Sequence, residues 1–364
     1  MTINEVAQIL EELSPLHYAE DFDNVGLLVG DAHKKVTSIL ITLDTLENVV
    51  DEAIAKKCNL IVSFHPILFK GIKKITGKTY VERVLLKAIK NNIAIFCLHT
   101  ALDNSILGVN NKICSVIGIE SPKILIPKRG TIKKLVTYVP NANAENLKNV
   151  LFKAGAGTIG NYSNCSFSNK GIGTFKAREH SNPTVGKIGE THQENETQLN
   201  ITFPSHIEGE ILSTLHKSHP YEEVAYEIST LENTNQHIGM GMIGELQEEM
   251  DEKAFFSHVK TKMMAKGIRH SAFLNKKVRK VAVLGGSGAF AISAAKKAGA
   301  DVFLTADIKY HQFYEAENKL VIADIGHFET EQFTKNLLVD FLTKKIPNFA
   351  ITLSESITNP IKYF

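Results

Sequence analysis

The chain has 364 residues, of which 43% are hydrophobic and 22% are charged, and its formal net charge is +2. This length fits about two or three domains, and this composition is typical of a globular protein with an apolar core. This small net charge argues against nucleic acid or an anionic membrane as the binding partner. No apolar run reaches the roughly 18–20 residues that a membrane span needs.

The first 15 residues, MTINEVAQILEELSP, have the pattern of an amphipathic helix with acidic residues, and lack the basic start of a signal peptide. The four cysteines are scattered and form no CxxC pair; they are Cys58, Cys97, Cys114 and Cys165. We therefore expect a cytoplasmic protein whose cysteines are small buried hydrophobic residues in a reducing compartment.

The first 120 residues or so alternate between predicted strands and helices. The pattern predicts strands over 36–44, 58–66 and 93–103, and helices over 45–57 and 80–91. Short, fully apolar strands with helical crossovers are typical of a parallel α/β sheet that is covered on both faces.

The middle of the chain has a different order of predicted strands and helices. Strand patterns at 131–140, 162–177, 197–204 and 222–229 alternate with helix patterns at 143–155 and 206–219. The order β-α-β-β-α-β is that of a ferredoxin-like unit. It predicts an insert over 129–236 between two halves of an α/β core, 1–128 and 237–364, with GMGMIGEL (239–246) as the return hinge.

The last 90 residues or so repeat the scheme of the first part. Strands are predicted over 278–286, 300–311 and 319–327, and helices over 289–299, 311–318 and 329–345. In both parts a helix and a strand lead to a histidine followed four residues later by a carboxylate. This pattern predicts a duplicated α/β core whose polar strand ends face one crevice, where α/β sheets bind ligands.

Four side chains at these strand ends form the strongest chemical pattern: His65, Asp103, His327 and Glu331. Each residue alone can be an ordinary strand-end polar group or a helix cap. Together, imidazoles and carboxylates are the ligand set of Zn²⁺, Mn²⁺ or Fe²⁺, and carboxylates can bridge two metal ions. The pattern predicts that His327 and Glu331 lie one helical turn apart, and that Pro66 ends the strand that delivers His65.

Three further residues are candidates for catalysis: His99, Asp307 and His311. His99 can be a metal ligand, a residue that orients Asp103, or a buried imidazole with satisfied hydrogen bonds. Asp307 and His311 follow another strand end, where they can bind substrate, transfer protons or pair with each other.

Two loops remain open in function. Asp23 and Asn24 precede an apolar run. For both residues, forming a turn is a simpler interpretation than a role in the site. The run VLGGSGAF (283–290) lies between a strand and a helix, where backbone N–H groups can hold a phosphate. It is neither a full GxGxxG nor a Walker motif, so a tight turn is the simpler interpretation.

At these residues the sequence resembles the Nif-three-like dinuclear metal-centre family, whose members are also named GTP cyclohydrolase 1 type 2 homologues. The resemblance covers nearly the whole chain and depends on six motifs in order: FDNVGLLVGD, SFHPILFKG, HTALDN, GGSG, ADIKYH and DIGHFETE. The segment SHPYEEVAYEI resembles the PII-like or CutA-like insert of the longer family members.

The resemblance implies a toroidal homohexamer and a site for one or two metal ions, with His65, Asp103, His327 and Glu331 as ligands. The family usually has two adjacent histidines where this chain has Phe64 and His65. Phenylalanine cannot bind a metal, so one metal position has lost a ligand or takes water or another side chain such as His99.

The resemblance implies a metal-dependent hydrolase that acts on a small molecule. In the first possible reaction, water activated by the metal hydrolyses a cyclic amidine C–N bond of GTP or another nucleotide, and His99 or His311 transfers protons. A phosphoesterase fits the same ligands. The alternative is a non-enzymatic hexameric scaffold that senses a metal or a metabolite, which the lost histidine favours.

Overall fold

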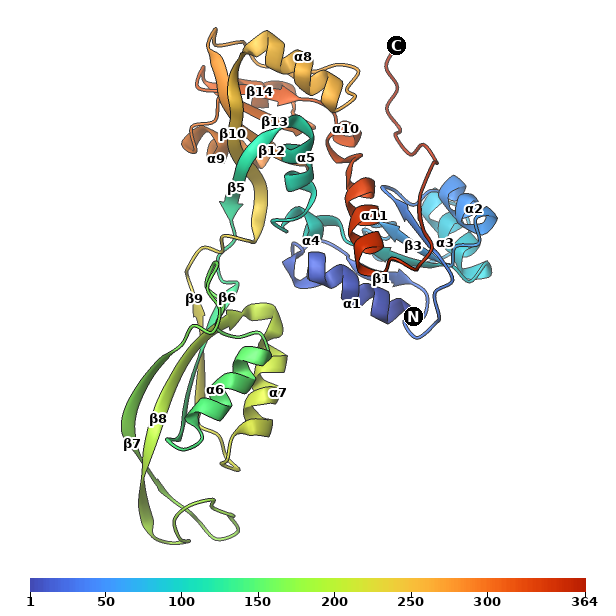
Figure 1. Cartoon of the computed structure of the whole chain (residues 1–364). Helices are drawn as coiled ribbons and strands as arrows, with labels where there is room; N and C mark the ends of the chain where they lie inside the picture. The colour runs from blue at the N-terminus through green and yellow to red at the C-terminus, as the bar shows by residue number, and fades with distance from the viewer. The chain divides into compact units, whose positions relative to one another are not determined.

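The computed structural model describes all 364 residues. The chain divides into two compact units, which we call the core (Met1–Pro127 with His237–Phe364) and the insert (Lys128–Gln236). Figure 1 shows both units in a mixed α/β chain with several sheets. No helix has both the length and the apolar character that crossing a lipid bilayer requires.

The first sheet of the core has the strand order β1-β4-β3-β2-β15, and only β1 runs antiparallel to its neighbour. Its strands are β1 (Gly26–Val29), β2 (Ile39–Thr42), β3 (Leu60–Ser63), β4 (Ala94–Cys97) and β15 (Ile351–Leu353). Strands β2, β3 and β4 are buried along their whole length. Such strands need cover on both faces, which explains their continuous apolar runs.

Helices cover both faces of this sheet. Side chains of α2 and α3 pack on one face and those of α1 and α11 on the other. These helices are α1 (Ile3–Leu13), α2 (Glu47–Ala55), α3 (Tyr80–Lys90) and α11 (Thr334–Lys345). Helix α1 begins with a capping box, in which Thr2 accepts a hydrogen bond from the Glu5 N–H and the Glu5 carboxylate accepts one from the Thr2 N–H.

The second sheet has the order β11-β14-β13-β12-β10-β5, with β12, β13 and β14 parallel. Strands β11, β10 and β5 pair antiparallel with their neighbours. The strands are β5 (Ile119–Pro127), β10 (Gly239–Asp251), β11 (Arg269–His270), β12 (Lys277–Ser287), β13 (Val302–Ala306) and β14 (Val321–Asp324). Its helices are α5 (Val109–Ile117), α8 (Glu252–Lys262) and α9 (Ile292–Lys297), with short turns η3 (Ala289–Ala291) and η4 (Tyr310–Ala316).

The two sheets share one hydrophobic cluster, which includes Ile41 and Val62 of the first sheet and Val283 and Leu304 of the second. Figure 1 shows α10 (His327–Glu331) and α11 between the sheets. Two short helical segments, η1 (Leu16–Tyr18) and α4 (His99–Asp103), complete the core. This arrangement brings strand ends of both sheets together.

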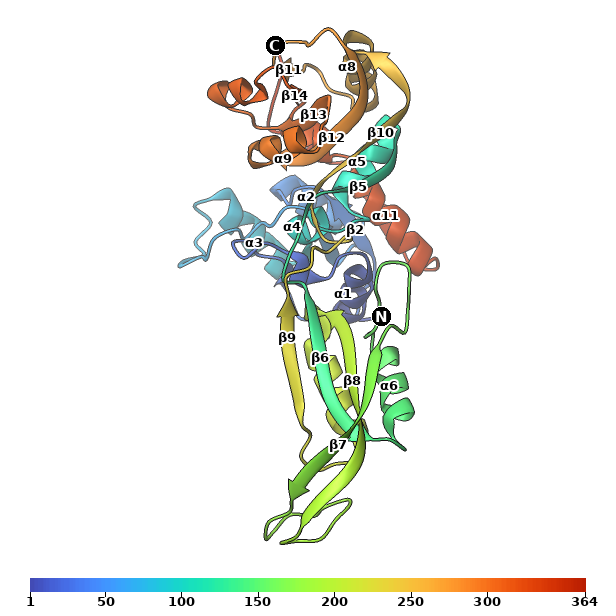
Figure 2. The ribbon, with the colours of Figure 1, turned by 90° about the vertical axis from the view of Figure 1, so that its left-hand side faces the viewer.

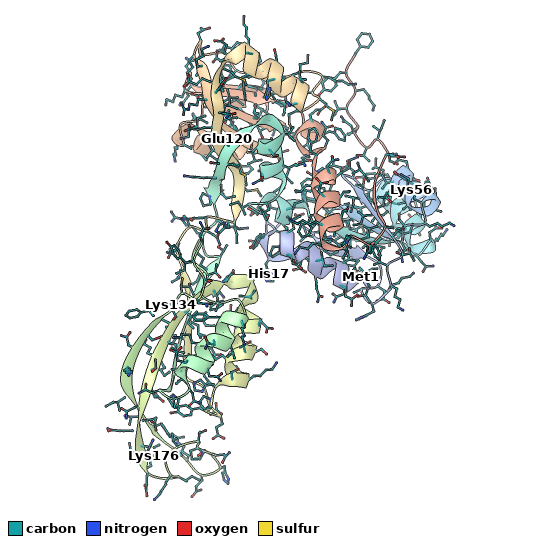
Figure 3. All side chains as sticks on the ribbon, in the orientation of Figure 1. Met1, His17, Lys56, Glu120, Lys134 and Lys176 are labelled. Atoms are coloured by element: carbon teal, nitrogen blue, oxygen red, sulfur yellow. The ribbon has the colours of Figure 1, made fainter.

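The insert is a four-stranded antiparallel sheet of order β7-β8-β6-β9, and Figures 1 and 2 show its two helices on one face. Its elements are β6 (Ile132–Pro140), α6 (Ala144–Lys153), β7 (Phe167–Lys176), β8 (Thr191–Pro204), η2 (Ser205–Ile207), α7 (Glu208–Ser218) and β9 (Tyr226–Leu231). Figure 3 labels Lys134 and Lys176, which mark the two ends of this sheet.

Three elements differ from the sequence-based expectation. The predicted strand 93–103 ends at Cys97, and its last five residues form α4. The predicted strand 300–311 ends at Ala306. The predicted hinge 239–246 is part of β10, because its apolar residues lie between two partner strands. Gly239 at its start pairs with Pro127 at the end of β5.

Candidate metal centre

The ends of β2 and β3 place a carboxylate beside an imidazole. The parallel register pairs Thr42 with Ser63, and beyond it the His65 N–H donates to the Leu43 carbonyl oxygen at 2.9 Å. Asp44 and His65 therefore leave the sheet together, and Asp44 Oδ1 lies 2.8 Å from His65 Nδ1. A carboxylate on Nδ1 fixes the ring and leaves Nε2 free to act as a ligand.

The second sheet repeats this arrangement. Gly326, with φ of +100°, turns the chain from β14 into α10. His327 and Glu331 are the first and last residues of that short helix, so they lie one turn apart as the sequence predicts. Asp307, at the end of β13, places Oδ2 2.7 Å from Nδ1 of His327 and accepts a hydrogen bond from the Ser287 hydroxyl.

The two imidazoles converge on one carboxylate oxygen. Oε2 of Glu331 lies 3.1 Å from Nε2 of His65 and 3.2 Å from Nε2 of His327. Neither contact has hydrogen-bond geometry, so this buried oxygen has no hydrogen-bond partner. Potential ligand atoms of all three residues lie within 4.8 Å of one another. Two imidazole nitrogens and one carboxylate oxygen that converge in this way match the ligand set of a divalent cation.

The pKa values reflect this crowding. Burial opposes protonation of His65, but contacts with Asp44 and Glu331 outweigh it and raise its pKa to about 10. Burial likewise opposes protonation of His327, and Glu331 and Asp307 raise its pKa to about 9. Burial opposes ionisation of Glu331, yet the two imidazoles hold its pKa at about 2. Without a cation, protons therefore take the place that a metal would fill.

Asp103 stands apart from this group of three. It is the last residue of α4, and its Oδ1 is buried without a hydrogen-bond partner. Burial, and then the charge of Glu331, raise the pKa of its carboxyl group well above the ordinary value. A buried carboxylate oxygen with no donor is unfavourable unless a cation or a proton compensates it.

His99 lies next to His65, with ring centroids 5.4 Å apart. Its Nδ1 is 2.8 Å from Oδ1 of Asp23, and the other Asp23 oxygen accepts hydrogen bonds from the Thr100 N–H and hydroxyl. Burial opposes ionisation of Asp23, but His99 and Thr100 dominate and lower its pKa to about 2. Asp23 thus orients His99 in addition to sitting in a turn.

The glycine-rich turn after β12 approaches the centre closely. Gly286 has φ of +68°, and a Cβ there would lie 2.5 Å from Oε1 of Glu331. Its N–H donates to the Thr330 hydroxyl, and the Gly285 N–H donates to Asn110 Oδ1. Because both donors are used inside the protein, this turn makes room for Glu331 and does not offer these two groups to a phosphate.

The structure separates the remaining candidates. Asp307 contacts His327, whereas His311 is exposed in η4 and its ring contacts Tyr310 and Tyr314. Asp307 has φ of +57°, so the chain turns directly after Ala306, where β13 ends. His311 is therefore not part of this strand. Sequence reasoning missed Asp44, for which the only signal was its place after a buried strand.

Comparison with known proteins assigns nearly the whole chain to one family. The family model described as Duf34/NIF3 (NGG1p interacting factor 3) matches residues 1–360. The chain belongs to the Duf34/NIF3 family. A Bacillus subtilis relative named GTP cyclohydrolase 1 type 2 homolog is 36% identical over 369 residues, which cover 99% of this chain and 98% of the relative.

Two solved structures have the same fold as this Duf34/NIF3 chain. A Bacillus cereus protein related to NIF3 is 37% identical, with a TM-score of 0.88 over 100% of this chain and 99% of that chain. A Staphylococcus aureus protein is 28% identical, with a TM-score of 0.80 over 100% and 99%. Phe64 of this Duf34/NIF3 chain is fully buried, and its ring centroid lies 4.9 Å from that of His65.

Proposed function

We propose that this protein binds a divalent metal ion, Zn²⁺, Mn²⁺ or Fe²⁺, through His65, His327 and Glu331. The observation that carries this proposal is the unpartnered Oε2 of Glu331, which lies between two imidazole Nε2 atoms. The Oδ1 of Asp103, buried without a hydrogen-bond partner, supports Asp103 as a fourth ligand. With this carboxylate the centre would have ligands for one or two metal ions.

We further propose a metal-dependent hydrolase activity. A divalent ion in this centre supplies Lewis acidity and lowers the pKa of water to about 7. Asp44 and Asp307 hold the two imidazole ligands in orientation. We assign proton transfer to His99, because Asp23 fixes its Nδ1 and its ring lies beside His65; His311 has no such contact.

The substrate class that we propose is a nucleotide, with GTP as the first candidate. The name of the curated relatives motivates this choice. The structure supports a planar ring near the centre: Phe69 is 47% exposed, and its ring centroid lies 6.2 Å from that of His99. Phe22, 66% exposed, lies beside Phe69 and extends this aromatic surface.

Turnover of nucleotides by the purified protein tests this proposal. We expect hydrolysis of GTP or another nucleotide with added Mn²⁺, Fe²⁺ or Zn²⁺, and its loss after chelation. The double variant His65→Ala/Glu331→Ala should lose both metal and turnover, whereas His33→Ala, an exposed histidine outside the centre, should keep both. Activity that persists in the double variant rules out the metal mechanism.

A second candidate is a non-enzymatic homohexamer that senses a metal or a metabolite. The buried Phe64, at a position where the family usually has histidine, favours it because it removes one ligand from the centre. Metal binding without turnover of any nucleotide, together with a hexamer mass by light scattering, supports this candidate over the hydrolase.

We also infer that the insert is a ferredoxin-like domain and that the two core sheets are copies of one unit. The insert orders its strands second, third, first, fourth along the sheet, all antiparallel, which fits the ferredoxin-like arrangement. Each core sheet has three parallel strands that are consecutive in the chain, and the strand just before them in sequence pairs antiparallel with the last of the three.

A further inference from the structure

The insert contains a cavity of about 720 Å³ on the sheet face opposite its helices. Leu199 and Ile201 of β8 pack with the helices, so the alternating residues Glu196 and Gln198 point to the other face. This volume lies in the range that small-molecule sites occupy. The cavity belongs to the insert alone and plays no part in the metal centre.

A buried carboxylate lies in the wall of this cavity. Glu196 is only 8% exposed, and its Oε1 accepts a hydrogen bond from the Tyr221 hydroxyl at 2.8 Å. Burial, and then Glu196, raise the pKa of Tyr221 well above its ordinary value, so Tyr221 remains the donor in this bond. The only side-chain hydrogen bond of Glu196 comes from this phenol. The charge of Glu196 also acts on His219, but burial lowers the pKa of His219, so this imidazole does not supply a cation. A buried carboxylate whose hydrogen-bond partner is a neutral phenol lacks the ion pair that would compensate its desolvation.

The backbone of β7 leaves room for this carboxylate. Gly171 lies opposite Glu196 in the strand register, and a Cβ on Gly173 would lie 2.1 Å from Oε2 of Glu196. Phe175, two residues further on, has its ring centroid 5.9 Å from that of Tyr221. The carboxylate of Glu196 thus lies over β7 where Gly171 and Gly173 have no side chains. The rings of Phe175 and Tyr221 line the same cavity.

The connection between β7 and β8 forms another wall of the cavity. Its Asn182 N–H donates to Glu222 Oε1 at 2.8 Å, and its Thr184 hydroxyl donates to the Pro220 carbonyl oxygen at 2.7 Å. These two bonds tie the connection to the segment that carries Tyr221. They hold a preformed cavity and lower the entropic cost of binding a ligand.

We propose that this cavity binds a small organic cation, a primary amine or a guanidine, whose N–H groups donate to Glu196. The carboxylate supplies the missing counter-charge, and the rings of Phe175 and Tyr221 favour a cation through their π faces. Exposed residues of both signs surround the cavity, so selectivity comes from Glu196 inside it. These residues are Lys170, Lys176, Arg178, Glu222 and Glu223.

Calorimetric titration of the full chain, freed of metal by chelation, tests this proposal with putrescine and agmatine as probes. Glutarate, of similar length and opposite charge, is the ligand control. We expect saturable binding of putrescine or agmatine and none of glutarate. Glu196→Gln, which keeps an acceptor for Tyr221, should weaken binding at least about tenfold. Glu194→Gln, on the same strand but outside the cavity, should change it less than about threefold.

Gly173→Ala gives an independent test, because the added methyl group displaces the Glu196 carboxylate without changing any charge. We expect a similar loss of binding in this variant, with an unchanged circular dichroism spectrum. Absence of saturable binding for both amines overturns the proposal. Equal affinities of the parent chain and Glu196→Gln, or equal binding of glutarate, overturn it as well.

Discussion

Asp44 and His65 are partners across two neighbouring parallel strands, with 2.8 Å between Asp44 Oδ1 and His65 Nδ1. The same arrangement recurs at His327 with Asp307, beyond the parallel strands β14 and β13. His99 also has a carboxylate on Nδ1, that of Asp23, although β4 and β1 beside them are antiparallel. Each imidazole therefore has one nitrogen held by a carboxylate, which fixes the direction of the other nitrogen.

Asp44→Asn should weaken metal binding without removing a ligand. The amide carries no charge to support His65, and loss of such an orienting partner typically costs about 10–100-fold in metal affinity. Competition with a chromophoric chelator measures the change. Asp51→Asn, at an exposed residue that pairs with Lys87, is the matched control. Equal affinities of the two variants would contradict the orienting role.

Metal affinity should fall steeply as the pH falls. The pKa values of His65 and His327 in the metal-free chain are about 10 and about 9, so both imidazoles carry a proton at pH 7. A metal binds only the neutral ring nitrogen and must displace these protons. Between pH 8 and pH 7 we expect about tenfold weaker binding for each proton displaced.

Calorimetry in buffers of different ionisation enthalpy counts those protons. Release of about two protons per bound ion at pH 7 agrees with the geometry. Glu331 contributes none in this range, because its pKa is about 2. Binding without proton release would show that the two imidazoles are not the ligands.

Glu331→Gln should destabilise the metal-free protein at neutral pH. The change leaves His65 and His327 as facing cations without the buried carboxylate between them. Breaking a buried ion pair from one side typically costs about 3 kcal/mol or more. Urea unfolding in chelator measures the loss. Glu355→Gln, whose carboxylate is exposed, should change the free energy of unfolding by less than about 0.5 kcal/mol.

Phe64→His should raise the number of metal ions bound per chain. Phe64 is fully buried, and its ring centroid lies 4.9 Å from that of His65 and 5.6 Å from that of His99. A histidine there gains a compensating partner only if a metal binds. Elemental analysis of the parent chain and the variant gives the two stoichiometries; Phe64→Leu controls for the change in packing. An unchanged metal count would contradict a ligand role for this position.

Much of the candidate centre could be predicted because its residues follow local patterns. His327 and Glu331 have helical spacing after a buried strand, and His65 precedes a proline that ends one. Asp44 lacked such a pattern, since its role depends on the register that pairs Thr42 with Ser63 across two strands. Register is a long-range property that one strand's sequence does not specify.

Two of the three differences between the expected and the observed elements have a related cause. Residues 239–246 contain three glycines and are typical of a hinge, but their apolar side chains fit between β5 and β12. His311 follows an apolar run, but the left-handed residue Asp307 ends the strand before it. Tertiary contacts decide the structure of residues 239–246, and one backbone angle decides where the strand before His311 ends. Each outweighs the local propensity.

Gly239 pairs with Pro127, so the chain departs for the insert and comes back on two adjacent antiparallel strands. A short β-turn can join the same two ends, because hairpin loops of two to five residues are common between such strands. The core can therefore gain or lose the whole insert without altering a backbone hydrogen bond of its own sheet. Evolution can treat the insert as an exchangeable module, and its cavity can diversify while the metal centre stays unchanged.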